Sequence, residues 1–390
     1  MSMGTIYFDY NATTPLDPEV RAAMVSVLEE HWGNPSSVHH VGRKARALLD
    51  EARERCSSVL GCKPSELIFT SGGTESVNQA LFGAARMMRD CGRHLITTAV
   101  EHHAVLHSLQ YLSRKEGFEL TFLPVDRTGR VDPKTLCSAI RPDTVLVSIM
   151  AANNEIGTIQ PVAELGAICR EKGVLFHTDA VQWFGKEPFE NIQQFNADLV
   201  SICAHKFHGP KGAGALYIRS PLHPDPILFG GGHENERRAG SEALHSIIGF
   251  TEALERFVRK PVFDSAHLRP LVAELRRSIE PVEGVHLVGS TEHSLSNTVS
   301  FVVERTDSIA LLAALDIEGV CASSGSACSS GSLEPSHVIS AIGLPADLAN
   351  SLVRFSLGRD STMDEVQTVA SLLPGVVRRA QLLDKSSSNL

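Results

Sequence analysis

Short apolar runs alternate with helical patterns between about residues 64 and 219. The runs that predict strands are residues 66–70, 95–98, 144–150, 173–178, 197–200 and 214–218. This alternation indicates an α/β domain built on a mostly parallel sheet. Ligands in such domains bind beyond the carboxyl ends of the strands, so we expect the functional residues there. The polar residues that follow these runs are Thr74, His102, Asn154, Asp179 and Lys206.

The pattern changes after His245. A long helical pattern begins there, and we expect Pro261 and Pro270 to break it, which predicts a domain boundary near residue 260. Further on, residues 297–303 resemble a strand and residues 308–315 a helix of a smaller α+β domain. We therefore predict a large domain over residues 15–260, a small domain formed by residues 1–14 and 261–380, and a polar tail over residues 381–390 that frays.

Composition excludes several classes of protein. The 390 residues are 43% hydrophobic, which is ample for a large core, and the net charge of −9 with dispersed basic residues does not favour nucleic acid or an anionic membrane. No apolar run approaches the ~20 residues of a membrane span, and the N-terminus does not resemble a signal peptide. Eight cysteines without a Cys-x-x-Cys pair indicate reduced thiols. We expect a soluble cytoplasmic protein.

Lys206 is the most informative residue, because an ammonium group at the end of a buried strand is costly unless it has a task. A lysine amine can form a Schiff base with an aldehyde cofactor. The strand before it ends in Asp179, and an aspartate can keep the pyridine nitrogen of pyridoxal phosphate protonated. Two adjacent strands that end in Asp and Lys therefore suggest a pyridoxal phosphate enzyme.

A glycine turn at residues 70–76 joins a strand to a helix. Its free N–H groups and the helix dipole can hold a phosphate, although an ordinary turn capped by threonine has the same sequence pattern. Because Asp179 and Lys206 already suggest pyridoxal phosphate, we predict that this turn binds the phosphate of the cofactor. Residues 209–214 resemble part of a nucleotide P-loop, but the spacing of that motif is absent.

His102, His103 and His107 lie at a predicted helix start. No carboxylate or cysteine completes a metal site with them, so we expect no metal. His102 can instead stack on an aromatic cofactor and transfer protons. Arg354 interrupts an apolar β-like run, which suits carboxylate binding, and a structural ion pair explains it nearly as well.

Cys328 lies within residues 322–332, a run of small residues that buries little apolar surface and should form a mobile, exposed loop. A cysteine there is not a core residue. We interpret it as an accessible nucleophile that swings into a site, and the alternative is an incidental surface thiol.

With these residues assembled, the chain resembles the cysteine desulfurases of the NifS/IscS type, which are class-V aminotransferases. The resemblance covers almost the whole length. The motifs that carry it are residues 9–15, 33–37, 70–76, 101–102, 153–157, 179–182, 205–206, 230–234, 238–241, 324–328 and 354–359. It implies a fold-type I pyridoxal phosphate homodimer with a mostly parallel seven-stranded sheet and active sites near the subunit interface.

The resemblance also implies roles by motif position. The catalytic residues would be the Schiff-base lysine Lys206, the sulfur acceptor Cys328 and the ring-stacking His102. The cofactor-binding residues would be Asp179 at the pyridine nitrogen, Gln182 at O3′, Gly73, Thr74, Cys203 and His205 at the phosphate, Asn154, and Ser241 of the other subunit. The substrate-binding residues would be Asn11, Asn154 and Arg354.

The implied reaction converts L-cysteine to L-alanine. Lys206 would remove the Cα proton, and the Cys328 thiolate would attack the substrate sulfur and become a persulfide. His102 would handle the proton of the substrate thiol. The persulfide would pass to an acceptor protein, either an iron–sulfur scaffold or a sulfur carrier, without direct contact with nucleic acid or membrane.

Two positions depart from the family pattern. Cys203 stands where many relatives carry a serine that bonds the phosphate, and a thiol is a poorer donor, so cofactor affinity could be lower or Cys203 could itself react. Ser241 stands where threonine is common and keeps the hydroxyl.

Three other functions compete with this one. A selenocysteine lyase would depend less on Cys328. A transaminase would leave the loop thiol unexplained. A non-catalytic sulfur-carrier scaffold would have no use for Asp179 and Lys206.

Overall fold

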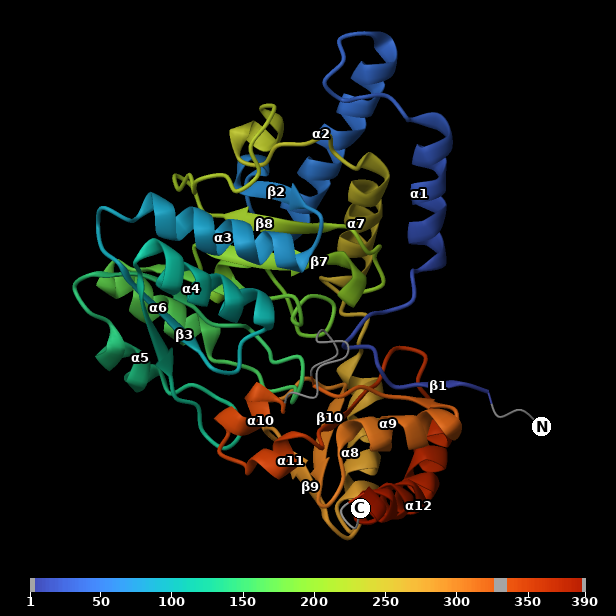
Figure 1. Ribbon diagram of the computed structural model, residues 1–390. Coiled ribbons are helices and arrows are strands. Elements are labelled where there is room, and N and C mark those ends of the chain that lie inside the picture. Colours follow the sequence, from blue (N-terminus) through green and yellow to red (C-terminus); the bar gives the residue numbers. More distant parts are fainter. Residues whose placement is uncertain (1–3, 326–334, 388–390) are drawn as a thin grey trace.

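The computed structural model describes residues 4–325 and 335–387, with side chains up to Leu382. Its largest element is a seven-stranded sheet (Figure 1). In spatial order the strands are β2 (Leu67–Thr70), β8 (Gly214–Ile218), β7 (Leu199–Cys203), β6 (Leu175–Asp179), β5 (Thr144–Ser148), β3 (His94–Thr98) and β4 (Glu119–Leu123). β8 runs antiparallel to both β2 and β7, and the other neighbours pair in parallel.

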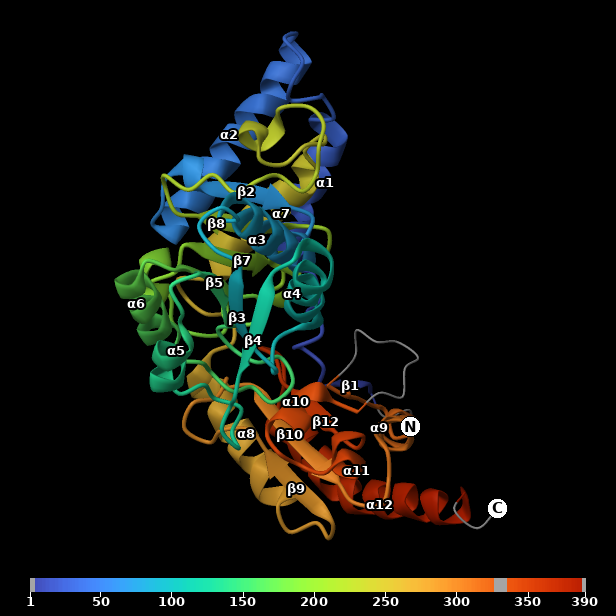
Figure 2. The same ribbon diagram turned by 60° about the vertical axis from the view of Figure 1, so that its left-hand side comes forward.

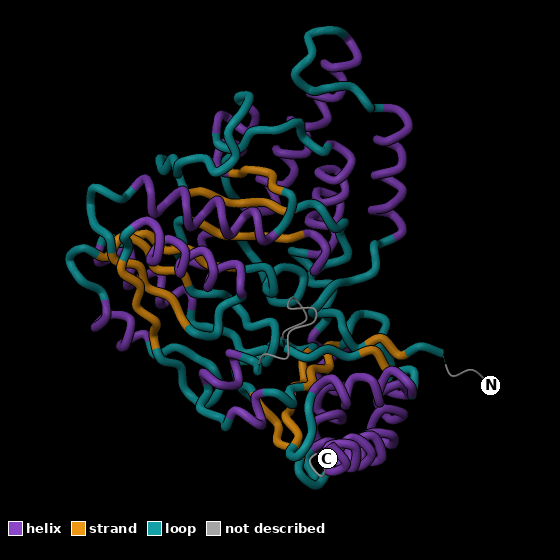
Figure 3. Tube along the Cα trace, in the orientation of Figure 1, coloured by secondary structure: helices purple, strands orange, loops and turns teal. Residues whose placement is uncertain are grey.

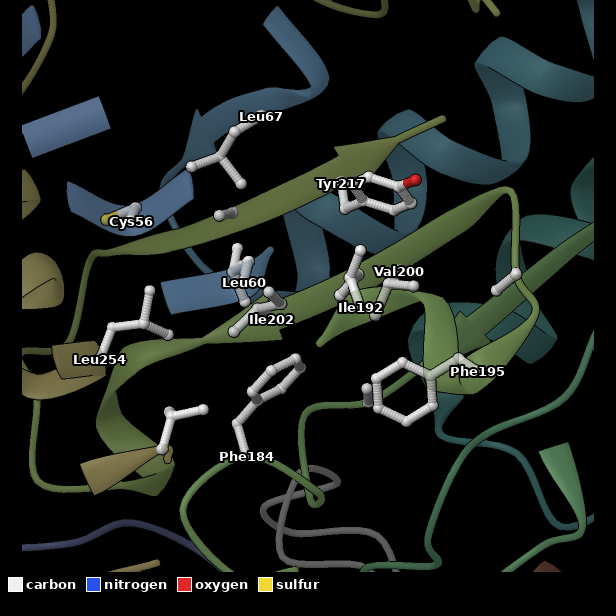
Figure 4. Packing of buried hydrophobic residues seen from close by; sticks show 14 of the residues in the cluster. Cys56, Leu60, Leu67, Phe184, Ile192, Phe195, Val200, Ile202, Tyr217 and Leu254 are labelled. Carbon is white, nitrogen blue, oxygen red and sulfur yellow. The ribbon is translucent and has the colours of Figure 1, made fainter. Parts of the chain in front are cut away.

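Helices cover both faces of this sheet. They are α1 (Pro18–Glu30), α2 (His40–Leu60), α3 (Gly73–Met87), α4 (His103–Glu116), α5 (Pro133–Ala139), α6 (Val162–Lys172) and α7 (Leu244–Phe257). Successive strand residues point to opposite faces, so that Leu199 packs with α3 and α4 whereas Val200 packs with α2, α6 and α7. Figure 4 shows the core on the face of Val200, in which Leu60 of α2, Leu254 of α7 and Ile202 of β7 belong to one buried cluster.

A second group of elements lies at one end of the molecule, as Figures 1 and 2 show. It contains the antiparallel sheet β12 (Val353–Ser356), β10 (Thr298–Val303) and β9 (Val285–Val288), and the parallel pair β1 (Ile6–Tyr7) and β11 (Val320–Cys321). Its helices are α8 (Ser265–Ile279), α9 (Ser308–Ile317), α10 (His337–Ala341), α11 (Ala346–Ala349) and α12 (Met363–Ser387). Because β1 pairs with β11, the first described residues of the chain lie beside its C-terminal part.

Short 3₁₀ helices join several of these elements. They are η1 (Pro64–Glu66), η2 (Ile192–Phe195), η3 (Ala204–Lys206) and η4 (His233–Glu236). Loops rather than helices or strands occupy the region where the two groups meet (Figure 3). η3 begins directly after β7 and brings Lys206 into that region.

The α/β prediction agrees with this architecture, while several local expectations were wrong. Pro270 does not break a helix, because it lies inside α8, whose apolar side chains Leu268, Leu271 and Leu275 are buried and outweigh one lost hydrogen bond. The predicted strand at residues 173–178 begins only at Leu175, since Gly173 ends α6 with a φ of 69°. The run at residues 214–218 is a strand, as predicted, and it is the antiparallel member of a sheet that is otherwise parallel.

Among the described residues, no helix is both long and apolar enough to cross a membrane. The predicted mobile loop around Cys328 falls mostly on residues 326–334, which lie outside the described part of the chain.

Candidate functional site

A cavity of about 300 Å³ lies at the carboxyl ends of the central strands. It is lined by polar residues that the sequence singled out and that come from both groups of elements. These are Asn11, Gly73, Thr74, His102, Asn154, Asp179, Gln182, Cys203, His205, Lys206 and Arg354. Gly325, the last described residue before the Cys328 segment, also lines the wall.

Lys206 reaches the cavity from η3. Its Nζ donates hydrogen bonds to the backbone oxygens of Asn11, at 2.7 Å, and Ala12, at 2.8 Å. η3 is anchored to the next strand because Ala204 N–H bonds the Ala213 oxygen. The N-terminal segment of the chain and the lysine therefore meet at the floor of the site.

Asp179 is the last residue of β6, beside β7, and its side chain is buried. Burial raises the pKa of Asp179 to about 6, and the positive charge of Lys206 opposes part of that rise. One carboxylate oxygen accepts a hydrogen bond of 3.0 Å from Val181 N–H. A carboxyl group that is costly to ionise in isolation is well suited to a cationic partner such as a pyridinium N–H.

His102 caps the N-terminus of α4, with Nδ1 accepting from Ala104 N–H at 3.1 Å. Burial, helped by the positive charge of Lys206, lowers the pKa of His102 to about 4, so the ring is neutral at neutral pH. Because Nδ1 uses its lone pair for the cap, the proton of the neutral ring is on Nε2. His102 therefore brings a defined proton donor to the cavity.

The predicted phosphate site is built around the N-terminus of α3. Gly73 is its first residue, and a Cβ there would lie 2.8 Å from Val181 Cγ2, so no other residue type fits without movement. Thr74 follows, and Cys203 and His205 line the same cavity. Burial raises the pKa of the Cys203 thiol and lowers the pKa of His205 to about 4, so both are neutral at neutral pH.

Arg354 projects from β12 into the cavity and is almost fully buried. It donates to the Asn154 backbone oxygen and to Asp9 Oδ1, each at 2.7 Å. The ion pair that the sequence left as an alternative is therefore present. These two bonds use one N–H of Nη1 and one of Nη2, so the guanidinium keeps further N–H donors for an anion.

Lys186 is a site residue that the sequence analysis missed. Its side chain is only 2% exposed, and its Nζ donates to Asn11 Oδ1 at 2.5 Å and to Gln182 Oε1. Burial, together with the charges of Lys206 and Arg354, lowers its pKa well below the ordinary value. The available signal was its position four residues after Gln182, which places both side chains on one side of a helical turn.

One predicted site residue lies apart from this cavity, and another falls outside the described part of the chain. Ser241 is exposed and lines a separate surface hollow with Asn34, Arg46 and Glu234. Cys328 lies outside the described residues, although Gly325 places the start of its segment at the cavity wall.

The cavity residues fit pyridoxal phosphate, the cofactor that the resemblance implies. A buried carboxyl group, a lysine amine and a neutral histidine line one space, and the first turn of α3 lines it as well, at a glycine where an added Cβ would collide with Val181. Such a turn with neutral neighbours is a suitable cradle for a phosphate dianion.

Comparisons with known proteins agree with this geometry. The aminotransferase class-V family model matches residues 6–369. A cysteine desulfurase IscS of Dictyoglomus turgidum is 46% identical over 379 residues, which cover 97% of this chain and 96% of the relative. A solved NifS-like protein superimposes with a TM-score of 0.89 at 37% identity, covering 96% of this chain and 100% of its own. A structure of SspA in complex with cysteine gives a TM-score of 0.79 at 33% identity, covering 92% and 100%. The chain therefore belongs to the class-V aminotransferases and, within them, to the cysteine desulfurase family of the NifS/IscS type.

Proposed function

We propose that this protein converts L-cysteine to L-alanine with bound pyridoxal phosphate and holds the released sulfur as a persulfide on Cys328. The observation that carries the proposal is one cavity lined by Asp179 at the end of β6, by Lys206 in η3 after the adjacent β7, and by Gly325, the last described residue before the Cys328 segment. The SspA relative, solved in complex with cysteine, supports the choice of substrate.

When bound, pyridoxal phosphate would withdraw electrons from the substrate Cα. In the proposal, Lys206 holds it covalently, Asp179 pairs with its ring nitrogen and Gln182 bonds its ring oxygen. Its phosphate would lie at Gly73 and Thr74, near Cys203 and His205, because these residues surround the N-terminal turn of α3.

Substrate recognition in the proposal depends on the carboxylate of L-cysteine. Arg354 supplies the positive charge, and Asn154 and Asn11 line the cavity beside it. The position of Arg354 is supported by its bonds to the Asn154 oxygen and Asp9, which hold the guanidinium against the cavity wall. A fixed guanidinium orients a carboxylate more strictly than a flexible lysine would.

The proton transfers fall to Lys206 and His102. The Lys206 amine is the proposed base for the Cα proton. As the Cβ–S bond breaks, Cβ must gain a proton, and we assign its donation to the Nε2–H of His102, whose ring lines the cavity. Nε2 then regains the proton that the substrate thiol gives up, so no proton is lost or gained overall.

The sulfur transfer balances without an outside oxidant. The Cys328 thiolate bonds the substrate sulfur, the Cβ–S bond breaks, and its electron pair goes to carbon, which takes up a proton and becomes the methyl group of alanine. Cβ is reduced by two electrons, and the two sulfurs, now joined as a persulfide, are oxidised by one each. A second thiol must then accept the outer sulfur before another turnover.

Three further parts of the proposal concern the surroundings of the enzyme. We propose a homodimer, in which the Ser241 of one subunit serves the site of the other. We propose a sulfur-acceptor protein, either an iron–sulfur scaffold or a sulfur carrier. Because Cys328 must return to the thiol after each transfer, a reducing compartment such as the cytoplasm suits the reaction.

The test is alanine release from L-cysteine in the presence of a reductant, for the wild type, Lys206→Ala, Cys328→Ala and the control Cys91→Ala, which alters an exposed cysteine. We expect alanine from the wild type and the control and almost none from the other two. Equal alanine from Cys328→Ala would remove Cys328 from the reaction and favour selenocysteine or another substrate. No alanine from any protein would contradict the function.

A further inference from the structure

Glu155 is a buried carboxylate in the motif of residues 153–157, where only its neighbour Asn154 has a proposed role. Its backbone N–H and C=O are both hydrogen-bonded, and so is the N–H of the next residue. Asn153 Oδ1 accepts from Glu155 N–H at 2.8 Å and from Ile156 N–H at 2.9 Å, and Ser300 Oγ donates to the Glu155 oxygen at 2.6 Å. A residue held in this way presents its side chain in one direction.

The Glu155 carboxylate contacts the chain on both sides of the segment that carries Cys328. After the segment, Ser336 Oγ donates to Glu155 Oε2 at 2.6 Å. Before it, Gly325 lies so close that a Cβ there would overlap the same oxygen. In the sequence, Cys328 therefore lies between two residues, Gly325 and Ser336, that both contact this carboxylate.

Both points are part of the ordered framework. Gly325 lines the cavity, and just before it Ser323 exchanges backbone hydrogen bonds of 3.2 and 2.7 Å with Arg354. Ser336 donates its N–H to the Ala349 oxygen at 2.9 Å, and its Oγ accepts from Ile339 N–H at the start of α10. The Glu155 carboxylate is thus bonded to Ser336 on one side and in close contact with Gly325 on the other.

The same turn reaches the other half of the reaction. The backbone oxygen of Asn154, the residue before Glu155, accepts from Arg354, the proposed ligand of the substrate carboxylate. The turn at residues 154–155 therefore contacts Arg354, which would orient the substrate. It also contacts Gly325 and Ser336, which flank the segment that carries Cys328.

We propose that Glu155 is a positioning residue for the sulfur transfer. It fixes the points at which the Cys328 segment leaves and rejoins the fold, and so sets how often the Cys328 thiolate meets the substrate sulfur. The rate of such an intramolecular encounter depends on the separation and orientation of the tether ends. This inference rests on the proposed function, in which Cys328 is the acceptor.

The test separates substrate binding from sulfur transfer in the holoenzyme. The variants are Glu155→Ala, Glu155→Gln, Ser336→Ala and Ser336→Thr, and the control is Glu304→Gln, at an exposed carboxylate that pairs with His286. Binding is followed by the change in cofactor absorbance on mixing with L-cysteine. Transfer is followed by quenching a single turnover and measuring the persulfide on Cys328 by mass.

For Glu155→Ala we expect an unchanged affinity in the absorbance step, within twofold, and at least a tenfold lower rate of persulfide formation. In Glu155→Gln and Ser336→Ala the rate of persulfide formation should fall about threefold, because each variant leaves part of the contact. Ser336→Thr, which keeps the hydroxyl, and Glu304→Gln should form the persulfide at the wild-type rate. In steady state the loss should fall on kcat and leave KM nearly unchanged.

Two results would overturn the inference. One is a wild-type rate of persulfide formation in Glu155→Ala; the other is an equal loss in the absorbance step and in the transfer step, which would mean a general structural role. If Glu155→Ala does not fold, Glu155→Gln and Ser336→Ala decide by the same comparison. A wild type that forms no persulfide at all would instead contradict the proposed function.

Discussion

Lys186 illustrates how individual side chains keep this site in order. A lysine with so little access to water would normally be strongly destabilising, yet here its Nζ satisfies the side-chain oxygens of Asn11 and Gln182 and lies 5.1 Å from the centre of the Phe263 ring. Gln182 Nε2 in turn donates to the Asn11 backbone oxygen at 2.9 Å. The three polar side chains therefore fix one another beneath the cavity.

Replacing Lys186 with methionine should lower the free energy of unfolding by roughly 1–3 kcal/mol, because Gln182 Oε1 loses a buried donor. Thermal unfolding followed by calorimetry measures this change. The matched control is Lys211→Met, at an exposed lysine close in sequence to the site. Equal melting temperatures for the wild type and Lys186→Met would show that the network does not stabilise the fold.

Glu101 gives a prediction on pH. Burial raises its pKa to about 8 from the ordinary value of 4.5, with Asp179 adding to the rise. Its Oε1 accepts from Thr98 Oγ1 at 3.0 Å and from Met150 N–H at 2.9 Å, while Oε2 has no partner among the described residues. The folded protein thus holds a proton that the unfolded chain releases above pH 4.5.

This proton contributes stability at low pH that is lost as the pH rises from about 4.5 to about 8, by up to ~1.4 kcal/mol per pH unit. Glu101→Gln mimics the protonated acid and should remove that loss. We expect the melting temperature of the variant to rise relative to the wild type between pH 5 and pH 8, and Glu304→Gln to show no such trend. A constant difference across this range would contradict the buried proton.

At the scale of elements, helix α3 sets the proposed phosphate site. Gly72, its N-cap, has a φ of 149°, and Gly73 packs against Val181 at the end of the neighbouring strand. The first turn therefore lies close to the cavity, which Gly73 and Thr74 both line, and its N–H groups have no partner within the helix. This arrangement depends on the absence of a Cβ at residue 73.

Gly73→Ala should weaken cofactor binding about tenfold or more, because the new methyl group must displace Val181 or move the first turn of α3. Titration of the cofactor-free protein with pyridoxal phosphate, followed by absorbance, gives the dissociation constant. Gly375→Ala is the control, since a Cβ within α12 meets nothing closer than 3.7 Å there. Equal dissociation constants for the wild type and Gly73→Ala would place the phosphate elsewhere.

The positions of strands could be predicted from the sequence better than their directions and limits. Buried strands such as β5 and β7 are nearly continuous apolar runs, which local composition reveals. The antiparallel direction of β8 depends on its pairing with β2 and β7, which no local pattern contains. Pro270 likewise was misjudged because the packing of α8, not its own sequence, decides the cost of a proline.

The site followed the same division. Asp179 and Lys206 could be found because each places a charge at or just after the end of a buried strand, where a charge demands a chemical reason. Lys186 and Glu155 could not be assigned, because their roles arise from contacts with residues far away in the chain, such as Asn11 and Ser336. Reactive residues near strand ends could therefore be predicted from the sequence, whereas the residues that position them could not.

At the scale of the whole molecule, one chain does not supply the complete proposed site. Ser241 lies on the surface, in a hollow apart from the cavity. Large apolar side chains are also exposed, among them Trp32 at 77%, Val38 at 88% and Phe229 at 82%. Exposed apolar groups of this size are typical of surfaces that are covered in an assembly, and we expect a second copy of the chain to cover them.

We therefore predict a particle of twice 42.2 kDa in analytical ultracentrifugation. Ser241→Ala should lower the affinity for pyridoxal phosphate severalfold, although Ser241 does not line the cavity of its own chain. Trp32→Glu should shift the protein toward monomers and lower that affinity as well. A monomeric wild type, or a Ser241→Ala protein with unchanged affinity, would contradict the shared site.

The central claim is that Cys328 accepts the sulfur of the substrate. The most direct test is to find which cysteine carries that sulfur after the reaction. The holoenzyme is incubated with L-cysteine labelled at sulfur, blocked with an alkylating reagent and digested, and the labelled peptides are identified by mass. We predict one labelled sulfur per chain, on the Cys328 peptide and released by a reductant. Label on the peptide of the buried Cys203, or on no cysteine while alanine is formed, would contradict the account.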